Sequence, residues 1–224
     1  MRLVLAPSPL LGPASLQPLA AALEALGHEA RALRLPSLLE IEGDYYPALA
    51  EAMAAAGPGD VLVTHSGGGA VVPLALQAAQ GRWAGVVLVD ALMPHPGRSW
   101  FDTAPAPLRA QLEAGAQQGL LPAWDAWWPP GALERLIPDE DARLAVLREL
   151  EPLPLAYFQE VAPALELTGP AAYLRLSGAY EGEARAAGRL GWPVIQLPLH
   201  HLAAVTHAEA VAGAVAALAG QLAG

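Results

Sequence analysis

The chain has neither cysteine nor lysine. Without cysteine it can form no disulfide framework, thiolate nucleophile or zinc ribbon. Without lysine it lacks the residue that reaches the phosphates in P-loop nucleotide-binding proteins, which argues against that class. Among the common covalent nucleophiles, serine therefore remains as the candidate.

Positive charge is also scarce. The 12 basic residues, all arginine, stand against 22 acidic residues, for a formal net charge of −10 and a pI near 4.9. The arginines are scattered singly, whereas phosphate-rich partners need concentrated positive charge, so we expect neither nucleic acid nor an anionic membrane as a partner. We expect a small-molecule substrate instead, bound by a monomer or homodimer.

Long apolar runs are absent as well. The run that begins at Leu3 is broken by Pro7 and Pro9 before it could form the core of a secretory signal peptide. No uninterrupted apolar stretch approaches the roughly 18 residues that span a bilayer. Since 54% of the 224 residues are hydrophobic, we expect a cytoplasmic protein with one large core.

Short apolar runs typical of strands alternate with Ala/Leu-rich stretches of helical spacing. This alternation predicts an α/β fold built on a mostly parallel sheet. The expected strands cover 3–6, 28–35, 61–63, 86–89, 172–176 and 194–197. The expected helices cover 15–26, 45–56, a stretch that ends near 80, and 208–222, and Gly57-Pro58-Gly59 is expected to close the second.

The segment 94–167 differs from the rest of the chain. It is rich in proline and short helical patches and has no strand-like run, which predicts a helical insertion over the strand ends. The core would then comprise 1–93 and 168–224. Its tryptophans could form either a roof over an apolar substrate pocket or the packed core of the insertion: Trp100, Trp124, Trp127 and Trp128.

The sharpest motif follows the buried run 61–63. A nucleophile on a tight strand-to-helix turn needs small neighbours, because its strained backbone would otherwise force side chains into the sheet. Thr64 and Gly68 occupy those positions around Ser66, in a relaxed form of G-x-S-x-G. At the start of the following helix, the Gly67 N–H would face a developing oxyanion.

A dinucleotide-binding turn is the competing interpretation. Gly67 and Gly69 fit the first half of its glycine pattern, and Asp90 ends the next strand, where a ribose-binding acid would lie. The third glycine position is Val72, however, and the turn does not follow the first strand. The nucleophile turn is favoured, and no cofactor is expected.

The run HSGGG over 65–69, together with the segment 199–211 before the last helix, resembles the α/β-hydrolase family. The resemblance implies a Ser-His-acid triad with Ser66 as nucleophile, and it favours His201 over His200 as the base by its distance from that helix. It also implies that His65 packs beside the turn. A metal site from His200, His201 and His207 matches no ligand motif, so none is expected.

The resemblance leaves the triad's acid open. The family usually places it in a Gly-x-x-Asp loop, but here Tyr180 stands at the aspartate position. Some members take the acid from the preceding strand, where Asp90 is found. Asp90 is favoured, with Glu183 and Glu181 as alternatives.

The family's second oxyanion donor is an N–H of the loop after the first strand. Here that loop begins Pro7-Ser8-Pro9 in place of the family's His-Gly. Because prolines cannot donate, Leu10 is favoured, with Ser8 and Leu11 as alternatives.

The implied function is a serine hydrolase that forms an acyl-enzyme with an ester or thioester of a small apolar or aromatic substrate. Two alternatives stay open because fold does not determine chemistry. The same triad could carry out another reaction, or the protein could bind a ligand in an accessory role without turnover.

Overall fold

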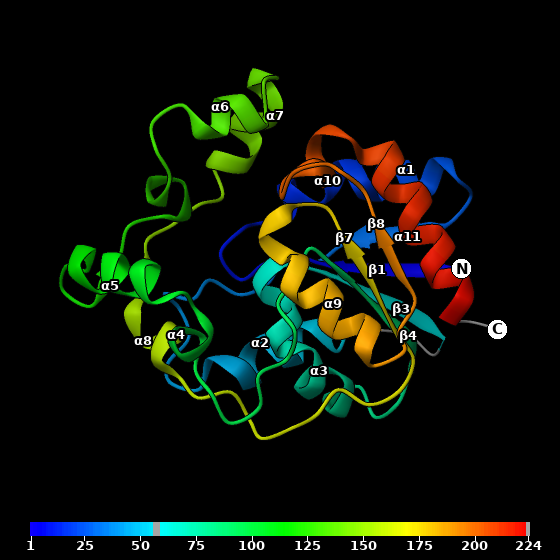
Figure 1. Cartoon of the computed structure of the whole chain (residues 1–224), viewed down its shortest axis with the longest axis horizontal. Helices are drawn as coiled ribbons and strands as arrows, with labels where there is room; N and C mark the ends of the chain where they lie inside the picture. The colour runs from blue at the N-terminus through cyan, green and yellow to red at the C-terminus, as the bar shows by residue number, and fades with distance from the viewer. Residues whose placement is uncertain (56–58, 223–224) are drawn as a thin grey trace.

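The computed structural model describes residues 1–55 and 59–222. Within them, a six-stranded sheet forms the centre, every neighbouring pair is parallel, and the strand order is β2-β1-β3-β4-β7-β8 (Figure 1). The bounds in that order are Glu29–Ala32, Arg2–Ala6, Asp60–His65, Trp83–Val89, Ala171–Arg175 and Val194–Gln196. The predicted α/β fold class is confirmed.

The central strands are buried on both faces. Every residue of β3 is buried, and so is nearly all of β4, as expected for strands that read as continuous apolar runs in a parallel sheet. The predicted strand 28–35 is shorter in the structure, because β2 lies at the sheet edge and its residues alternate between exposed and half-buried.

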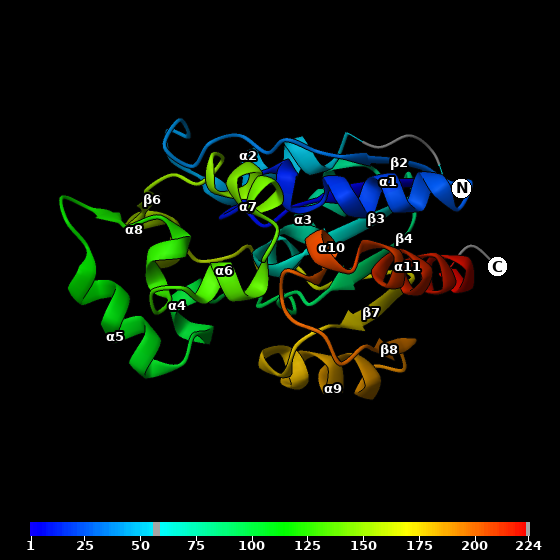
Figure 2. The same ribbon diagram turned by 90° about the horizontal axis from the view of Figure 1, so that it is seen from above.

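Helices cover both faces of the sheet. On one face, α1 packs against α11, and their leucines and valines form a core with the apolar side chains of β1, β3 and β4. On the other face lie α2, α3 and α9, with α9 packed on β7 (Figures 1 and 2). The bounds are α1 Gln17–Ala25, α2 Tyr45–Met53, α3 Val72–Ala78, α9 Glu181–Arg189, α10 Ala203–Thr206 and α11 Ala208–Leu222.

The predicted helix 45–56 ends earlier, at Met53. Two of the three residues expected to close this helix, Gly57 and Pro58, lie outside the described residues. No helix in the described ranges is long and apolar enough to cross a membrane.

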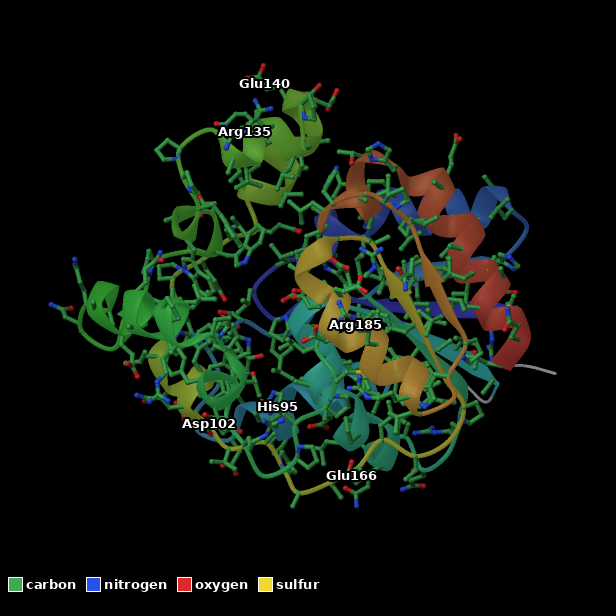
Figure 3. The ribbon with its side chains drawn as sticks, in the orientation of Figure 1. His95, Asp102, Arg135, Glu140, Glu166 and Arg185 are labelled. Carbon is green, nitrogen blue, oxygen red and sulfur yellow. The ribbon has the colours of Figure 1, made fainter. Side chains whose placement is uncertain are left out.

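The chain between β4 and β7 forms a separate group of short elements beyond the carboxyl ends of the strands (Figure 2). Its helices are α4 Trp100–Thr103, α5 Ala106–Gly115, α6 Ala132–Leu136, α7 Glu140–Leu147 and α8 Leu155–Gln159. The expectation that this segment has no strand was wrong, because β5 (Leu120–Leu121) pairs antiparallel with β6 (Leu153–Pro154). Figure 3 labels Arg135 of α6 and Glu140 at the start of α7, at the top of the view.

Glutamates of this segment fasten it to the rest of the fold. Glu149 Oε2 accepts a hydrogen bond from the Ala14 N–H at 2.7 Å. Glu160 accepts from the N–H groups of Tyr45, at 2.8 Å, and Tyr46, at 3.0 Å, at the start of α2. Because the first N–H groups of a helix lack partners inside the helix, these carboxylates join the segment to the starts of α2 and of the short 3-10 helix Pro13–Ser15.

Candidate active site

The turn after β3 holds Ser66 in a strained backbone conformation. Ser66 has a φ of 55°, in the left-handed region that a non-glycine residue seldom adopts, and it begins the 3-10 helix Ser66–Val71. The turn also needs its glycines, because a Cβ at Gly68 would overlap Thr64 Oγ1 and one at Gly69 would overlap the Leu92 carbonyl oxygen. The strain and the close packing hold the Ser66 side chain at the end of the buried strand.

His201 lies in the loop between β8 and α10 and reaches Ser66 across the strand ends. Its Nε2 is 3.0 Å from Ser66 Oγ, and its Nδ1 is 2.8 Å from Asp90 Oδ2. The carboxylate can only accept, so Nδ1 carries the proton and Nε2 is free to accept the Ser66 hydroxyl proton. The structure thus joins Ser66, His201 and Asp90 in one chain of hydrogen bonds.

Asp90 follows β4 and is fully buried, with a φ of 43°. Besides His201, it accepts hydrogen bonds from the Leu176 N–H at 2.8 Å, the Ser177 N–H at 2.9 Å and the Ser177 hydroxyl at 2.7 Å. Burial alone would raise the pKa of Asp90, but the hydrogen bonds and charge of His201 and the Ser177 donors lower it below its ordinary value. Asp90 is therefore an ionised partner for His201.

Neither alternative acid occupies this position. Glu181, at the start of α9, forms ion pairs with Arg175 and Arg185, each at 3.1 Å. Glu183 is half-buried, and burial raises its pKa. His201 Nδ1 faces Asp90 rather than either glutamate.

His65 packs against His201. The two imidazole rings lie 4.5 Å apart at an angle of 31°, and His65 Nε2–H donates to the His201 carbonyl at 2.9 Å. Burial, and then the proximity of His201, lower the pKa of His65 to about 3, so it is neutral at physiological pH. His200 instead bonds Thr206 Oγ1 at 3.0 Å, outside the triad.

Tyr180 is a site residue that pattern reasoning missed. It stands where the family's loop aspartate was expected, and its Oη lies 3.4 Å from Ser66 Oγ. Burial raises the pKa of Tyr180, so its hydroxyl stays protonated. The substitution of tyrosine for aspartate was visible in the sequence, but the contact with Ser66 depends on how the loop folds.

The loop after β1 packs close to Gly67, the residue that follows Ser66. A Cβ built on Gly67 would be 3.2 Å from Ser8 Oγ and 3.5 Å from Pro9 Cδ. The Leu10 N–H, which was the favoured second oxyanion donor, donates to Ser8 Oγ at 3.3 Å. The Leu11 N–H donates to the Ser8 carbonyl at 2.9 Å. Both N–H groups are thus engaged within the loop.

The four tryptophans of the 94–167 segment separate into two groups. Trp124 lies beside the triad, with its ring 6.3 Å from that of His201, and the more exposed Trp128 packs edge-on against it at 5.5 Å. Trp100 and Trp127 pack on Phe158, at 5.1 and 5.7 Å, inside the segment. Trp124 is therefore the tryptophan of this set whose ring lies against His201.

The described residues contain no group of three or more His, Asp or Glu side chains arranged to hold a metal ion.

Comparison with known proteins identifies the fold that carries this site. No protein-family model and no curated protein sequence matches the chain. Solved structures do. An extracellular α/β-hydrolase from a Paenibacillus species matches with a TM-score of 0.77 at 18% identity, over 97% of this chain and 98% of that one.

Two further structures match over nearly the whole chain. A pyrethroid hydrolase from Sphingobium faniae JZ-2 has a TM-score of 0.71 at 20% identity, covering 98% of this chain and 97% of that one. Polyneuridine aldehyde esterase has a TM-score of 0.70 at 21% identity, covering 97% and 98%. Structural similarity at 18–21% sequence identity is evidence of a shared fold.

Proposed function

This chain has the α/β-hydrolase fold, and from that premise we propose that it is a serine hydrolase that cleaves an ester or thioester through an acyl-enzyme. The observation that carries the proposal is the continuous chain of hydrogen bonds from Ser66 Oγ through His201 to Asp90, at 3.0 and 2.8 Å. A serine hydroxyl is a weak nucleophile until an adjacent base takes its proton, and this arrangement supplies the base and its orienting carboxylate.

The proposed reaction begins when Ser66 Oγ attacks the substrate carbonyl and His201 Nε2 takes the hydroxyl proton. Asp90 keeps the proton on Nδ1 and stabilises the imidazolium that forms. The Gly67 N–H, at the start of a helix, donates to the oxyanion. His201 then protonates the leaving alkoxide or thiolate. Water, deprotonated by the same nitrogen, then attacks the acyl-enzyme. The bond to Ser66 Oγ breaks, His201 returns the proton to that oxygen, and the acid is released.

The walls of the site favour an uncharged substrate. The aromatic rings of Trp124 and Tyr180 both lie against His201, which suits a small apolar or aromatic group beside the reacting carbonyl. We also propose that residues 94–167 act as a cap over the site, since the segment lies beyond the strand ends and carries Trp124.

The test uses p-nitrophenyl acetate and a fluorophosphonate probe. We expect the wild-type protein to hydrolyse the ester and to be labelled at Ser66, and Ser66→Ala to lose both. Ser37→Ala is the matched control, because Ser37 bonds Glu151 away from the triad, and it should retain both. Full activity in Ser66→Ala would refute the proposal, while binding of small aromatic esters without labelling would favour the accessory role.

A further inference from the structure

The loop after β1 has few groups left to stabilise an oxyanion. Pro7 and Pro9 have no N–H, and the N–H groups of Leu10 and Leu11 are already bonded to Ser8 Oγ and the Ser8 carbonyl. Tetrahedral intermediates in acyl transfer are usually held by more than one preorganised donor. Among residues 7–11 of this loop, the remaining candidates are the N–H and the hydroxyl of Ser8.

The Ser8 hydroxyl is buried and faces the residue after the nucleophile. Ser8 is 1% exposed, and its Oγ lies 3.2 Å from the point where a Cβ of Gly67 would stand. Because Oγ accepts the Leu10 N–H, the hydroxyl hydrogen is free to point elsewhere. Within the part of the chain that the structure describes, that hydrogen meets no acceptor.

We propose that the Ser8 hydroxyl is the second oxyanion donor, acting opposite the Gly67 N–H. This inference rests on the proposed function of Ser66. A buried donor that lacks an acceptor is costly, and the oxyanion is the acceptor that would satisfy it during the reaction. The charge then meets one backbone donor and one side-chain donor.

The loop is built to hold this hydroxyl in place. Proline rings on both sides of Ser8 restrict the backbone, and the Leu10 N–H fixes the oxygen. A donor positioned before the reaction needs no reorganisation when the charge develops. A side chain at Gly67 would crowd this hydroxyl, because its Cβ would lie 3.2 Å from Ser8 Oγ.

Tyr157 is the competing donor. Its hydroxyl lies 4.0 Å from the same Cβ position, is buried, and stays protonated because burial raises its pKa. Ser8 is nearer at 3.2 Å and comes from the loop that borders the nucleophile turn. The experiment therefore compares removal of each hydroxyl.

The kinetic test measures kcat and KM for p-nitrophenyl acetate. We expect Ser8→Ala to lower kcat by about 10²–10³-fold with little change in KM, because the lost donor acts mainly in the transition state. Ser8→Thr, which keeps a hydroxyl, should recover most of the loss, and Tyr157→Phe should have a smaller effect. Ser15→Ala is the matched control, since Ser15 is equally buried in the same connection but bonds Gly12.

A second measurement separates the donor role from packing. A trifluoromethyl ketone forms a tetrahedral adduct with the nucleophile, and its affinity should fall in Ser8→Ala by a factor similar to the fall in kcat/KM. Thermal unfolding identifies any variant that is merely misfolded.

Each of three results would overturn the Ser8 assignment while leaving Ser66 as the nucleophile. They are a wild-type kcat in Ser8→Ala, equal losses in folded Ser8→Ala and Ser8→Thr, and a major loss confined to Tyr157→Phe. A wild-type protein that neither turns over the ester nor forms the adduct would instead refute the proposed function, and this inference with it.

Discussion

The rings of Tyr180 and His201 lie parallel, with centroids 5.0 Å apart and an angle of 5° between their planes. The same tyrosine brings its hydroxyl to 3.4 Å from Ser66 Oγ. One side chain therefore contacts both the proposed base and the proposed nucleophile. It comes from the loop in which the resemblance placed an aspartate, whereas the carboxylate bonded to His201 is that of Asp90, which follows the neighbouring strand β4.

Tyr180→Phe tests the hydroxyl separately from the ring. The variant keeps the stacking on His201 and removes one hydrogen bond to Ser66, so we expect kcat to fall about two- to tenfold, the range for one neutral hydrogen bond. Tyr180→Ala also removes the stacked ring and should lose more. Steady-state kinetics and a pH–rate profile of both variants provide the measurement. Equal rates for wild type and Tyr180→Phe would show that the hydroxyl has no role.

Asp90→Asn tests the choice of acid. An asparagine at this position would favour the wrong tautomer of His201, and we expect kcat to fall by about 10⁴-fold, the loss that the equivalent change causes in a serine protease triad. Glu181→Gln and Glu183→Gln are the matched controls, and both should keep the wild-type kcat. A large loss in Glu183→Gln together with an active Asp90→Asn would reverse the assignment.

Much of this arrangement follows from local patterns. The continuous apolar runs of β3 and β4 predict central strands, and parallel neighbours bring Ser66 and Asp90 to the same edge of the sheet. The small residues after Ser66 predict a tight turn. In the structure, a Cβ at Gly68 would overlap Thr64 Oγ1 and one at Gly69 would overlap the Leu92 carbonyl oxygen. These inferences need the order and burial of the strands, but no detail of loop conformation.

The remaining features depend on how loops fold against each other. The hydrogen bond from Leu10 to Ser8 Oγ redirects an N–H that the residue order alone left free. The stacking of Tyr180 on His201 joins two loops that follow different strands. The β5-β6 pair has two residues per strand, too few for any periodicity, and is stabilised by pairing across the segment. Spacing along the chain carries little information about such contacts.

The lowered pKa of the buried His65 side chain predicts how the free energy of unfolding depends on pH. Burial lowers the pKa of His65 to about 3, whereas an unfolded histidine titrates near 6.5. Between these values the unfolded chain binds a proton that the folded chain does not, so stability falls as pH decreases below 6.5. One such group gives a slope of up to about 1.4 kcal/mol per pH unit.

Urea unfolding at pH 7, 6 and 5 measures this slope. The pKa values of His95 and His200 are lowered as well, chiefly by burial, and add to it. His65→Gln should remove the contribution of one proton and flatten the curve, even if the variant is less stable at pH 7. A slope unchanged by His65→Gln would contradict the assignment of a neutral, buried His65.

Glu160 is expected to stabilise the fold by capping α2 from the 94–167 segment. Its carboxylate accepts from the Tyr45 and Tyr46 N–H groups at 2.8 and 3.0 Å, where the helix dipole also favours negative charge. Glu160→Ala should therefore lower the free energy of unfolding by about 1–2 kcal/mol, the usual cost of losing an N-terminal cap. Glu166→Ala is the control, because Glu166 is exposed at the periphery in Figure 3, and it should change stability by less than about 0.5 kcal/mol. Chemical denaturation of the two variants provides the comparison, and equal stabilities would show that the bonds from Glu160 to α2 contribute nothing to holding the segment in place.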